Sequence, residues 1–479
     1  MAHAYYAVAP EAVPALEGRI DLLAEELGVD AAFPPEVLTE ADAAAGAAAL
    51  PALDRTDLPL LTIDPPGARD LDQAMFLERR DDGYTVHYAI ADVASFVRPG
   101  GAIDHEAHRR GETLYAPTRR IPLHPPALSE DAASLLPGVV RPALLWSIDL
   151  DAHGSQVGAQ VVRARVRSTA QLDYEGVQHQ VDAGEGPETL GLLREIGELR
   201  QRLEAERGGV SLPLPTQEIE PGADGAWRLS YREPVLSEGW NEQISLLTGM
   251  AAAAMMIEAR VGLVRTLPPA DERGLVRLRR AARGLGIAWP DAMPYPEFVR
   301  TLDPAQPRHV AMLEACTGLL RGAGYVAFDG ELPALVEHSA IAAPYAHATA
   351  PLRRLADRYV GEVCLAVSAG EPVPDWVRRA LPELPKVMAG TGRLASSFDR
   401  AVLDLVEAVV LSDSVGETFE GVVIDADDKD PEKGTVLLDE PAVEGRVVGT
   451  APLPLGEPVQ VVLDEADVDA RVVRFRLAR

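Results

Sequence analysis

The chain has 479 residues, of which 47% are hydrophobic and 25% are charged, and this composition is typical of a globular protein rather than a disordered one. The length predicts two to four domains. Cys316 and Cys364 have no CxxC or Cys/His companion, which argues against a disulfide framework and a zinc site. The N-terminus lacks a signal-peptide pattern, and the longest apolar run, residues 246–257, is too short to cross a bilayer. We therefore expect a cytoplasmic protein without a membrane partner.

The net charge of −29 argues against a nucleic-acid partner, because an acidic surface repels phosphate groups. An average over the whole chain says little about a narrow channel, however. Carboxylates gathered at a metal site also count as negative charge until cations bind them. The charge therefore lowers the expectation of RNA binding without excluding it.

Residues 1–57 are predicted to form a small helical domain, because the apolar residues between positions 20 and 27 fall on one helical stripe. Residues 23–30 resemble the first helix and turn of a helix-turn-helix or winged-helix motif, with Gly28 able to adopt a positive φ. A plain helical hairpin explains the same pattern equally well.

The long region from residue 58 to residue 400 has a mixed pattern. Residues 84–91 are typical of a strand, whereas residues 188–206 and 242–264 have the apolar spacing of helices. Strands come early and helices come late. This order favours an α+β domain over a doubly wound sheet.

The last region, residues 412–479, contains short valine- and leucine-rich runs separated by Gly, Pro and Asp. Five or so short strands in this length predict a small β-barrel of the OB-fold type. From residue 416 onward there are 15 acidic and 7 basic residues, and the only aromatic residues are Phe419 and Phe475. Such a barrel is a poor stacking platform for RNA bases.

Residues 62–74 contain the most informative pattern, in which Asp64, Asp70 and Asp72 fall within nine residues. A Pro-Pro-Gly turn lies between the first acid and the other two, so the turn can bring all three together. Hard oxygen ligands without His or Cys indicate Mg²⁺, or alternatively Mn²⁺. By spacing alone, a solvated acidic turn explains these residues about as well as a metal site.

A second informative stretch covers residues 345–357. Thr349 can cap a helix whose first turn contains Pro351, which places Arg353 and Arg354 at the helix N-terminus. The helix dipole opposes cations at that position, so we expect a phosphate or the carboxylate cluster opposite these arginines. The alternative is an ion pair with an acid such as Asp357.

These residues resemble the motifs of the RNB exoribonucleases, the family that contains RNase II and RNase R. Residues 62–74 follow the family's acidic motif, and residues 345–357 follow its later arginine motif. The resemblance covers about residues 55–365, and the terminal barrel resembles the S1 domain that follows in this family. Shorter matches lie in the family's order at residues 55–58, 90–93, 128–131 and 141–144.

The resemblance implies a monomeric enzyme that degrades single-stranded RNA processively from its 3′ end to nucleoside 5′-monophosphates. It implies a buried site with two Mg²⁺ ions, held by Asp64, Asp70, Asp72 and the residue at position 73. Asp72 is expected to be the most critical ligand, and Asp70 shares in catalysis. Arg353 is expected to stabilise the charge that develops on the scissile phosphate.

The same resemblance assigns the RNA contacts. Tyr115 matches a ring that stacks on a terminal base, and Tyr174 and Glu242 match positions that contact ribose. Thr349 and Arg354 complete the expected RNA-binding residues.

Three departures from the family pattern leave other functions open. Gln73 stands where the family has a fourth carboxylate, Leu212 stands near the position of a second stacking ring, and only about 57 residues precede the catalytic region. Gln73 and Leu212 are compatible with a catalytically weakened RNA-binding relative. The pattern at residues 23–30 is compatible with a regulatory protein that binds DNA.

Overall fold

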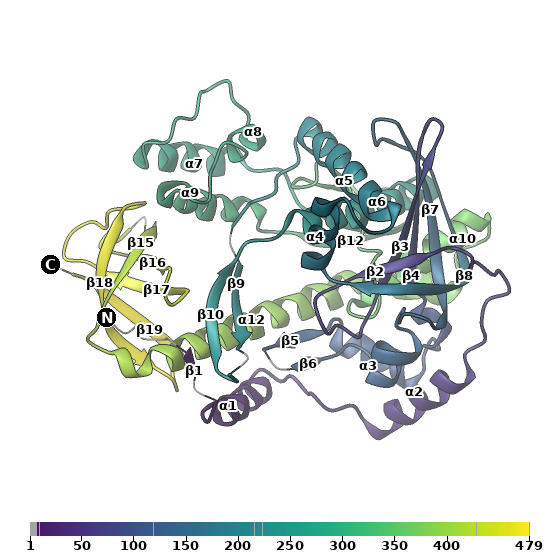
Figure 1. The fold of residues 1–479 in the computed structure, drawn as a ribbon, viewed down its shortest axis with the longest axis horizontal. Helices are drawn as coiled ribbons and strands as arrows, with labels where there is room; N and C mark the ends of the chain where they lie inside the picture. The colour runs from purple at the N-terminus through teal and green to yellow at the C-terminus, as the bar shows by residue number, and fades with distance from the viewer. Residues whose placement is uncertain are drawn as a thin grey trace.

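The computed structural model describes residues 7–8, 10–117, 119–214, 216–222, 224–427 and 429–478 (Figure 1). Five early strands close into a barrel in the order β2-β3-β4-β7-β8. All neighbouring strands are antiparallel except β2 and β8, which run parallel. The predicted strand at residues 84–91 is confirmed as β4. The bounds are β2 (Leu60–Ile63), β3 (Gln73–Arg80), β4 (Gly83–Ala91), β7 (Val140–Asp151) and β8 (Gln156–Leu172).

Helices from the middle of the chain pack on this barrel, so the α+β expectation is confirmed (Figure 1). The predicted helix at residues 188–206 is confirmed as α5. The predicted helix at residues 242–264 is only partly right, because it ends at Ala259. Arg260 adopts a φ of 56°, and the β-branched and apolar residues that follow form β11, which pairs with β12. These elements are α4 (Tyr174–Ala183), α5 (Glu188–Arg207), α6 (Leu236–Ala259), α10 (Leu355–Ala369), β11 (Val261–Thr266) and β12 (Gly324–Asp329).

The N-terminal segment contains the two helices expected of it, α1 (Val13–Glu26) and α2 (Pro35–Ala47). They belong to different hydrophobic clusters. Leu23 of α1 is buried in a cluster shared with the C-terminal barrel, whereas Val37 of α2 is buried against the barrel formed by β2, β3, β4, β7 and β8. The described residues therefore do not form a helix-turn-helix as one packed unit, because each helix buries its apolar face elsewhere.

The C-terminal segment forms a second closed barrel in the order β15-β16-β17-β19-β18, which confirms the predicted OB-like fold. Phe419 and Phe475 are 4% and 1% exposed and meet edge to face at 6.0 Å between ring centroids. Both rings therefore fill the barrel core and cannot stack on RNA bases. The strands are β15 (Thr418–Ala426), β16 (Lys433–Leu438), β17 (Val443–Val448), β18 (Pro458–Asp467) and β19 (Val472–Leu477).

Smaller elements connect these units, and no described helix is long and apolar enough to cross a membrane. Figure 1 shows α7, α8 and α9 together on one side of the molecule. The remaining strands are β1 (Ala7–Val8), β5 (Leu114–Ala116), β6 (Arg119–Ile121), β9 (Thr216–Pro221), β10 (Trp227–Arg232), β13 (Glu337–His338) and β14 (Ala343–Pro344). The remaining helices are η1 (Val93–Ser95), α3 (Ala102–Arg110), η2 (Leu128–Ala132), α7 (Glu272–Gly284), α8 (Tyr295–Val299), α9 (Pro307–Thr317), η3 (Gly318–Leu320), α11 (Asp375–Ala380), α12 (Leu384–Leu411) and η4 (Ser412–Ser414).

The long helix α12 runs from the side of the barrel formed by β2, β3, β4, β7 and β8 to the C-terminal barrel (Figure 1). Near its end, Glu407 is only 3% exposed. Its Oε1 accepts a hydrogen bond from Gln217 Nε2 at 2.8 Å and another from the backbone N–H of Glu444 at 3.2 Å. Burial raises the pKa of Glu407 from its ordinary value of 4.5 to about 7.

This buried acid predicts how stability depends on pH. Because the pKa of Glu407 is raised by folding, its contribution to stability is full below pH 4.5 and is lost as the pH rises through 7. A Glu407→Gln variant keeps an oxygen acceptor without the ionisation. We expect it to exceed the wild type in stability by about 2 kcal/mol at pH 8, with little difference at pH 4.5.

Thermal unfolding at both pH values measures this difference. Glu258→Gln, which changes an exposed acid on α6, is the matched control and is expected to behave like the wild type. A gain for Glu407→Gln that is equal at pH 4.5 and pH 8 would contradict the ionisation argument.

Candidate active site

The first acid, Asp64, directly follows β2 at one end of the catalytic barrel. Its backbone N–H donates to the carbonyl of Leu172 at 3.0 Å, which extends the pairing of β2 with β8 by one residue. The predicted turn is present, since Ala68 N–H donates to the Pro65 carbonyl at 3.1 Å and Gly67 has a φ of 78°. The chain is thereby folded back toward β3.

The loop between β2 and β3 is fixed by one buried hydroxyl, that of Ser134. Its Oγ donates to the carbonyl of Arg69 at 2.6 Å and accepts from the backbone N–H of Leu71 at 3.0 Å. Leu71 itself is fully buried. These contacts hold the acids on either side of Leu71 in defined positions.

Asp72 is the most buried of the three acids, with 3% of its surface exposed. Its Oδ1 accepts a hydrogen bond from the backbone N–H of Leu352 at 2.7 Å. Its Oδ2 lies 3.2 Å from Nε of Arg353 in an ion pair, yet has no hydrogen bond from any described residue. Burial raises the pKa of Asp72 to about 7, and the charge of Arg353 opposes that rise.

Asp64 shares this buried environment. Its Oδ2 is also buried without a hydrogen-bond partner among the described residues. Burial raises its pKa to about 6, and the neighbouring charge of Asp70 adds to the effect. The charge of Asp70 therefore acts on both Asp64 and Asp72, which shows that the turn brings the three acids near one another. The three carboxylates do not converge on a single point.

Asp70 is held by a residue that the sequence did not indicate. Arg120, on β6, forms an ion pair with Asp70 through its Nη1 and Oδ1 atoms. The side chains of Arg120 and Asp70 are 26% and 13% exposed. The sequence offers little indication of this pair, because Arg120 and Asp70 are 50 residues apart and two adjacent arginines in a hairpin are common on protein surfaces.

Arg353 lies beside the acids, but the helix that was expected to begin before it starts later. Residues 350–354 form a turn in which the N–H groups of Arg353 and Arg354 donate to the Ala350 carbonyl, and α10 begins only at Leu355. The prediction that Pro351 occupies the first turn of this helix was therefore wrong. The physical reason is that Arg354 is extended and bridges to Glu112, so the Arg353 carbonyl accepts from the Thr113 N–H instead of from a helical N–H.

The two adjacent arginines have different roles. Arg354 donates two hydrogen bonds to Asp357, at 2.8 and 3.1 Å, so its guanidinium is committed to the protein. Arg353 has 46% of its side chain exposed and faces Asp72. The ion pair considered as an alternative is thus formed by Arg354, and the residue beside the carboxylate cluster is Arg353.

Gln73 is also engaged within the protein. Its Nε2 donates to the backbone carbonyl of Thr349 at 2.6 Å, and its Oε1 accepts from the hydroxyl of Tyr88 at 2.8 Å. Thr349 is buried and contributes its carbonyl rather than an exposed side chain. Tyr88 contacts Ser245 as well, and neither residue was foreseen from the sequence.

The expected RNA contacts fall into two groups. Tyr115 is 46% exposed. Burial of its hydroxyl raises the pKa, the charge of Arg353 lowers it, and the charges of Asp70 and Asp72 raise it. Burial and the charge of Asp64 raise the pKa of Tyr174. These two rings therefore lie at the acidic cluster.

Glu242 and Leu212 lie differently. Glu242 is exposed on α6, and its neighbour Asn241 contacts the Tyr174 hydroxyl at 3.5 Å. Leu212 is half-buried against a cluster that includes Phe298. It therefore serves packing in this structure.

The donor set fits a hard divalent cation in one respect. Asp64 and Asp72 present buried carboxylate oxygens that receive no hydrogen bond from the part of the chain that the structure describes, and a cation satisfies such atoms. No three His, Cys, Asp or Glu side chains within the described ranges already converge as a complete ligand set. The third acid is instead paired with Arg120.

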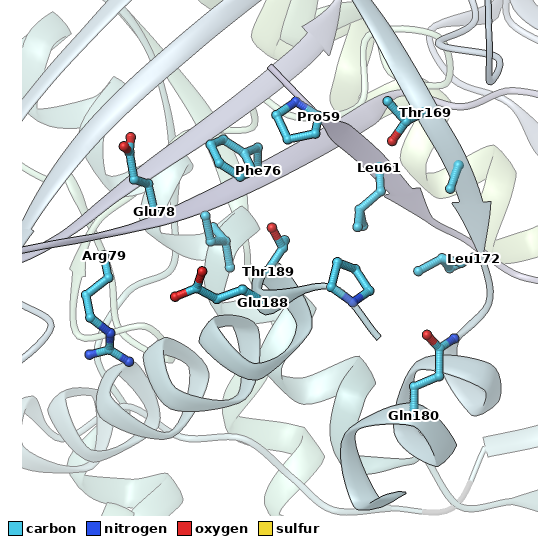
Figure 2. A pocket seen from close by; sticks show the side chains of 13 residues that line it. Pro59, Leu61, Phe76, Glu78, Arg79, Thr169, Leu172, Gln180, Glu188 and Thr189 are labelled. Atoms are coloured by element: carbon cyan, nitrogen blue, oxygen red, sulfur yellow. The ribbon is translucent and has the colours of Figure 1, made fainter. Parts of the chain in front are cut away.

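A separate cavity of about 610 Å³ lies where β2, β3 and β8 face α4 and α5 (Figure 2). Figure 2 shows Leu61, Phe76 and Leu172 on the strand side, with Gln180 and Glu188 on the helix side. None of the acids or arginines of the candidate site lines it. This cavity is therefore distinct from the carboxylate cluster.

The contacts of Gln73 lead to a prediction about metal binding. In Gln73→Glu, a carboxylate oxygen faces the Thr349 carbonyl and adds negative charge to the cluster. We expect the melting temperature in EDTA to fall, because the lost hydrogen bond and the repulsion cost about 1–3 kcal/mol. Added Mg²⁺ should raise that temperature more than it does in the wild type.

Thermal unfolding with and without Mg²⁺ measures both effects. Gln201→Glu makes the same change on the exposed face of α5 and should leave both temperatures close to the wild type. An equal Mg²⁺ response in Gln73→Glu and the wild type would mean that position 73 does not face the cation site.

Comparison with known proteins gives a consistent result. The RNB domain family matches residues 53–368, and the RNase II-type exonuclease C-terminal S1 domain matches residues 417–478. Ribonuclease R of Escherichia coli strain K12 is 28% identical over 396 residues, covering 78% of this chain and 48% of that protein. The human exosome complex exonuclease RRP44 is 27% identical over 333 residues, covering 66% of this chain and 34% of that protein. The chain thus spans about half the length, or less, of these curated relatives.

Solved structures share the fold. The apo form of Mycoplasma genitalium RNase R superposes with a TM-score of 0.85 at 18% identity, covering 96% of this chain and 78% of that one. Yeast Ssd1, described as a pseudonuclease, superposes with a TM-score of 0.67 at 16% identity, covering 83% of this chain and 50% of that one. Since the RNB match covers more than half of the chain, this protein belongs to the RNB domain family and carries an RNase II-type C-terminal S1 domain.

Proposed function

We propose that this protein is a metal-dependent exoribonuclease that degrades single-stranded RNA processively from its 3′ end and releases nucleoside 5′-monophosphates. The observation that carries the proposal is the buried Asp72 carboxylate, whose Oδ2 has only the ion pair with Arg353 and no hydrogen bond from the described residues. One ion pair leaves such a buried oxygen poorly satisfied, and a bound divalent cation can satisfy it. Its place within the RNB domain supports the same activity.

Asp64 and Asp72 are the two residues best placed to hold such a cation, with Asp70 as a third ligand once it is free of Arg120. Mg²⁺ is our first choice and Mn²⁺ the second, because all the donors are oxygens. Bound there, two such ions supply Lewis acidity toward a phosphate and lower the pKa of a water. Gln73 donates a hydrogen bond to the Thr349 carbonyl and holds that residue in place, so we do not propose it as a free metal ligand.

The remaining groups position RNA. Arg353 is half-exposed beside Asp72, where its guanidinium can donate to a phosphate oxygen as negative charge grows. Tyr115 presents an exposed ring on which a base can stack, and Tyr174 lies by Asp64. Glu242 is kept as a weaker candidate for a ribose contact, because it lies beside Asn241 rather than the acids.

Single-stranded RNA is the proposed substrate because Asp72, the acid that carries the proposal, is buried, and a single strand reaches a buried group more easily than a duplex does. A related solved structure is Mycoplasma genitalium RNase R in complex with ribose-methylated single-stranded RNA, at 18% identity. The C-terminal barrel contributes little stacking, since both of its phenylalanine rings are buried. The monomeric state and the cytoplasmic location are kept as predictions.

A second candidate function has specific support. Gln73 is tied to Thr349, Asp70 is tied to Arg120, and the fold also resembles yeast Ssd1, described as a pseudonuclease. These observations favour a weakened RNA-binding relative. The DNA-binding alternative is less favoured, because Leu23 is buried against other parts of the protein.

RNA labelled at its 5′ end separates the two candidates. With Mg²⁺ we expect the full-length band to be replaced by short 5′-labelled end products with few intermediates, as processive removal from the 3′ end requires. We expect Asp72→Asn to bind the same RNA while shortening it on the order of a thousandfold more slowly, because loss of metal-assisted catalysis costs several kcal/mol. Asp81→Asn, in the exposed turn after β3, is the matched control with wild-type activity.

Two outcomes would contradict the proposal. A full-length band that persists with wild-type protein and Mg²⁺, although RNA is bound, would favour the weakened relative. A wild-type rate in Asp72→Asn would remove the assigned site even if degradation were real.

A further inference from the structure

Arg120 forms an ion pair with Asp70, the third acid of the proposed cation site. It lies on β6 directly opposite Tyr115 of β5, so both side chains belong to the hairpin that borders the acids. Its Nη1 pairs with Oδ1 of Asp70. Nothing in the composition or the motifs indicated a role for this arginine.

A guanidinium that is hydrogen-bonded to a carboxylate oxygen, as Arg120 is to Asp70, competes with a divalent cation for that oxygen, whereas Arg353 makes no hydrogen bond to Oδ2 of Asp72. The guanidinium and the cation are both positive, and at a few ångströms their repulsion is weakly screened in a partly buried site. The Asp70 side chain is 13% exposed and that of Arg120 is 26% exposed. While Arg120 stays on Asp70, this acid therefore cannot complete a cation site with Asp64 and Asp72.

A second acceptor for Arg120 is already within reach. Its Nη2 lies 3.8 Å from Oε1 of Glu130, a residue of η2 whose side chain is 28% exposed. The backbone carbonyl of Glu130 accepts from Nη2 of Arg69 at 3.3 Å, which fixes this acid beside the loop. A small rotation of the guanidinium therefore exchanges one acid for the other without leaving the arginine unpaired.

We propose that Arg120 is a positioning residue that occupies Asp70 in the metal-free protein and transfers to Glu130 when a divalent cation binds. This inference rests on the proposed metal-dependent function. The proposed role of Arg120 differs from that of Arg353. Asp72 accepts a hydrogen bond from the backbone N–H of Leu352, so it does not need an arginine to stay in place. Arg120 thus sets the affinity of the site for the cation rather than acting on the substrate.

The test measures Mn²⁺ binding to the full, metal-free chain by isothermal titration and by the electron paramagnetic resonance of free Mn²⁺. We expect Arg120→Gln to bind Mn²⁺ roughly threefold to tenfold more tightly than the wild type, because the competing cation is gone. Arg119→Gln makes the same change on the next residue, which pairs with Asp21 of α1, and should bind as the wild type does.

Glu130→Gln gives the opposite sign. Without its second acceptor, Arg120 stays on Asp70, so we expect Mn²⁺ to bind roughly threefold to tenfold more weakly. In an Arg120→Gln background the same Glu130→Gln change should have little effect. A loss of equal size in both backgrounds would mean that Glu130 acts on the cation by itself, and it would overturn the transfer.

Unchanged or weaker Mn²⁺ binding in Arg120→Gln would show that Arg120 does not compete with the cation for Asp70, and it would overturn the proposal. If that variant does not fold, Arg120→Lys and Glu130→Gln still decide, because the lysine keeps the competing charge and should not tighten binding. Asp72→Asn and Asp70→Asn distinguish the two proposals. If neither weakens Mn²⁺ binding, the metal site of the proposed function fails; if they do and Arg120→Gln has no effect, only the role of Arg120 fails.

Discussion

One hydrogen bond, from the backbone N–H of Leu352 to the buried carboxylate of Asp72, joins two segments that are 280 residues apart. A buried carboxylate requires partners, and the chain supplies this one only after the early barrel and the later segment before α10 have come together. The contact has two consequences. It fixes the backbone of Leu352 against the early barrel, and it places Arg353 beside Asp72, whose Oδ2 atom has no hydrogen bond from the described residues.

Buried ion pairs hold the helix behind this site. Arg354 pairs with Asp357, Arg358 with Asp104 at 2.6 Å, and Arg163 with both Asp92 and Glu362. These charges neutralise one another, so α10 can lie fully against the barrel although it is rich in ionisable groups. The overall charge of −29 is therefore a poor guide to the site, where Arg353 and Arg120 offset acids at close range.

The predictions from sequence succeeded where the signal is local. The strand at residues 84–91, the helix of α5 and the C-terminal barrel follow from periodicity and turn residues, and the Pro-Pro-Gly turn follows from its own conformational limits. They failed where distant contacts decide. The late start of α10 depends on the bridge between Arg354 and Glu112, the pairing of Asp70 depends on Arg120, and closure of the catalytic barrel depends on parallel pairing of β2 with β8.

The central claim is that Asp64 and Asp72 form a cation site at the end of the catalytic barrel. Crystals grown with Mn²⁺ and measured near the manganese absorption edge test it most directly, since the anomalous signal locates the ion without assumptions about activity. We expect a strong peak between the Asp64 and Asp72 carboxylates, with the Arg120 side chain displaced from Asp70. A map with no peak there, while Arg120 still pairs with Asp70, would contradict it.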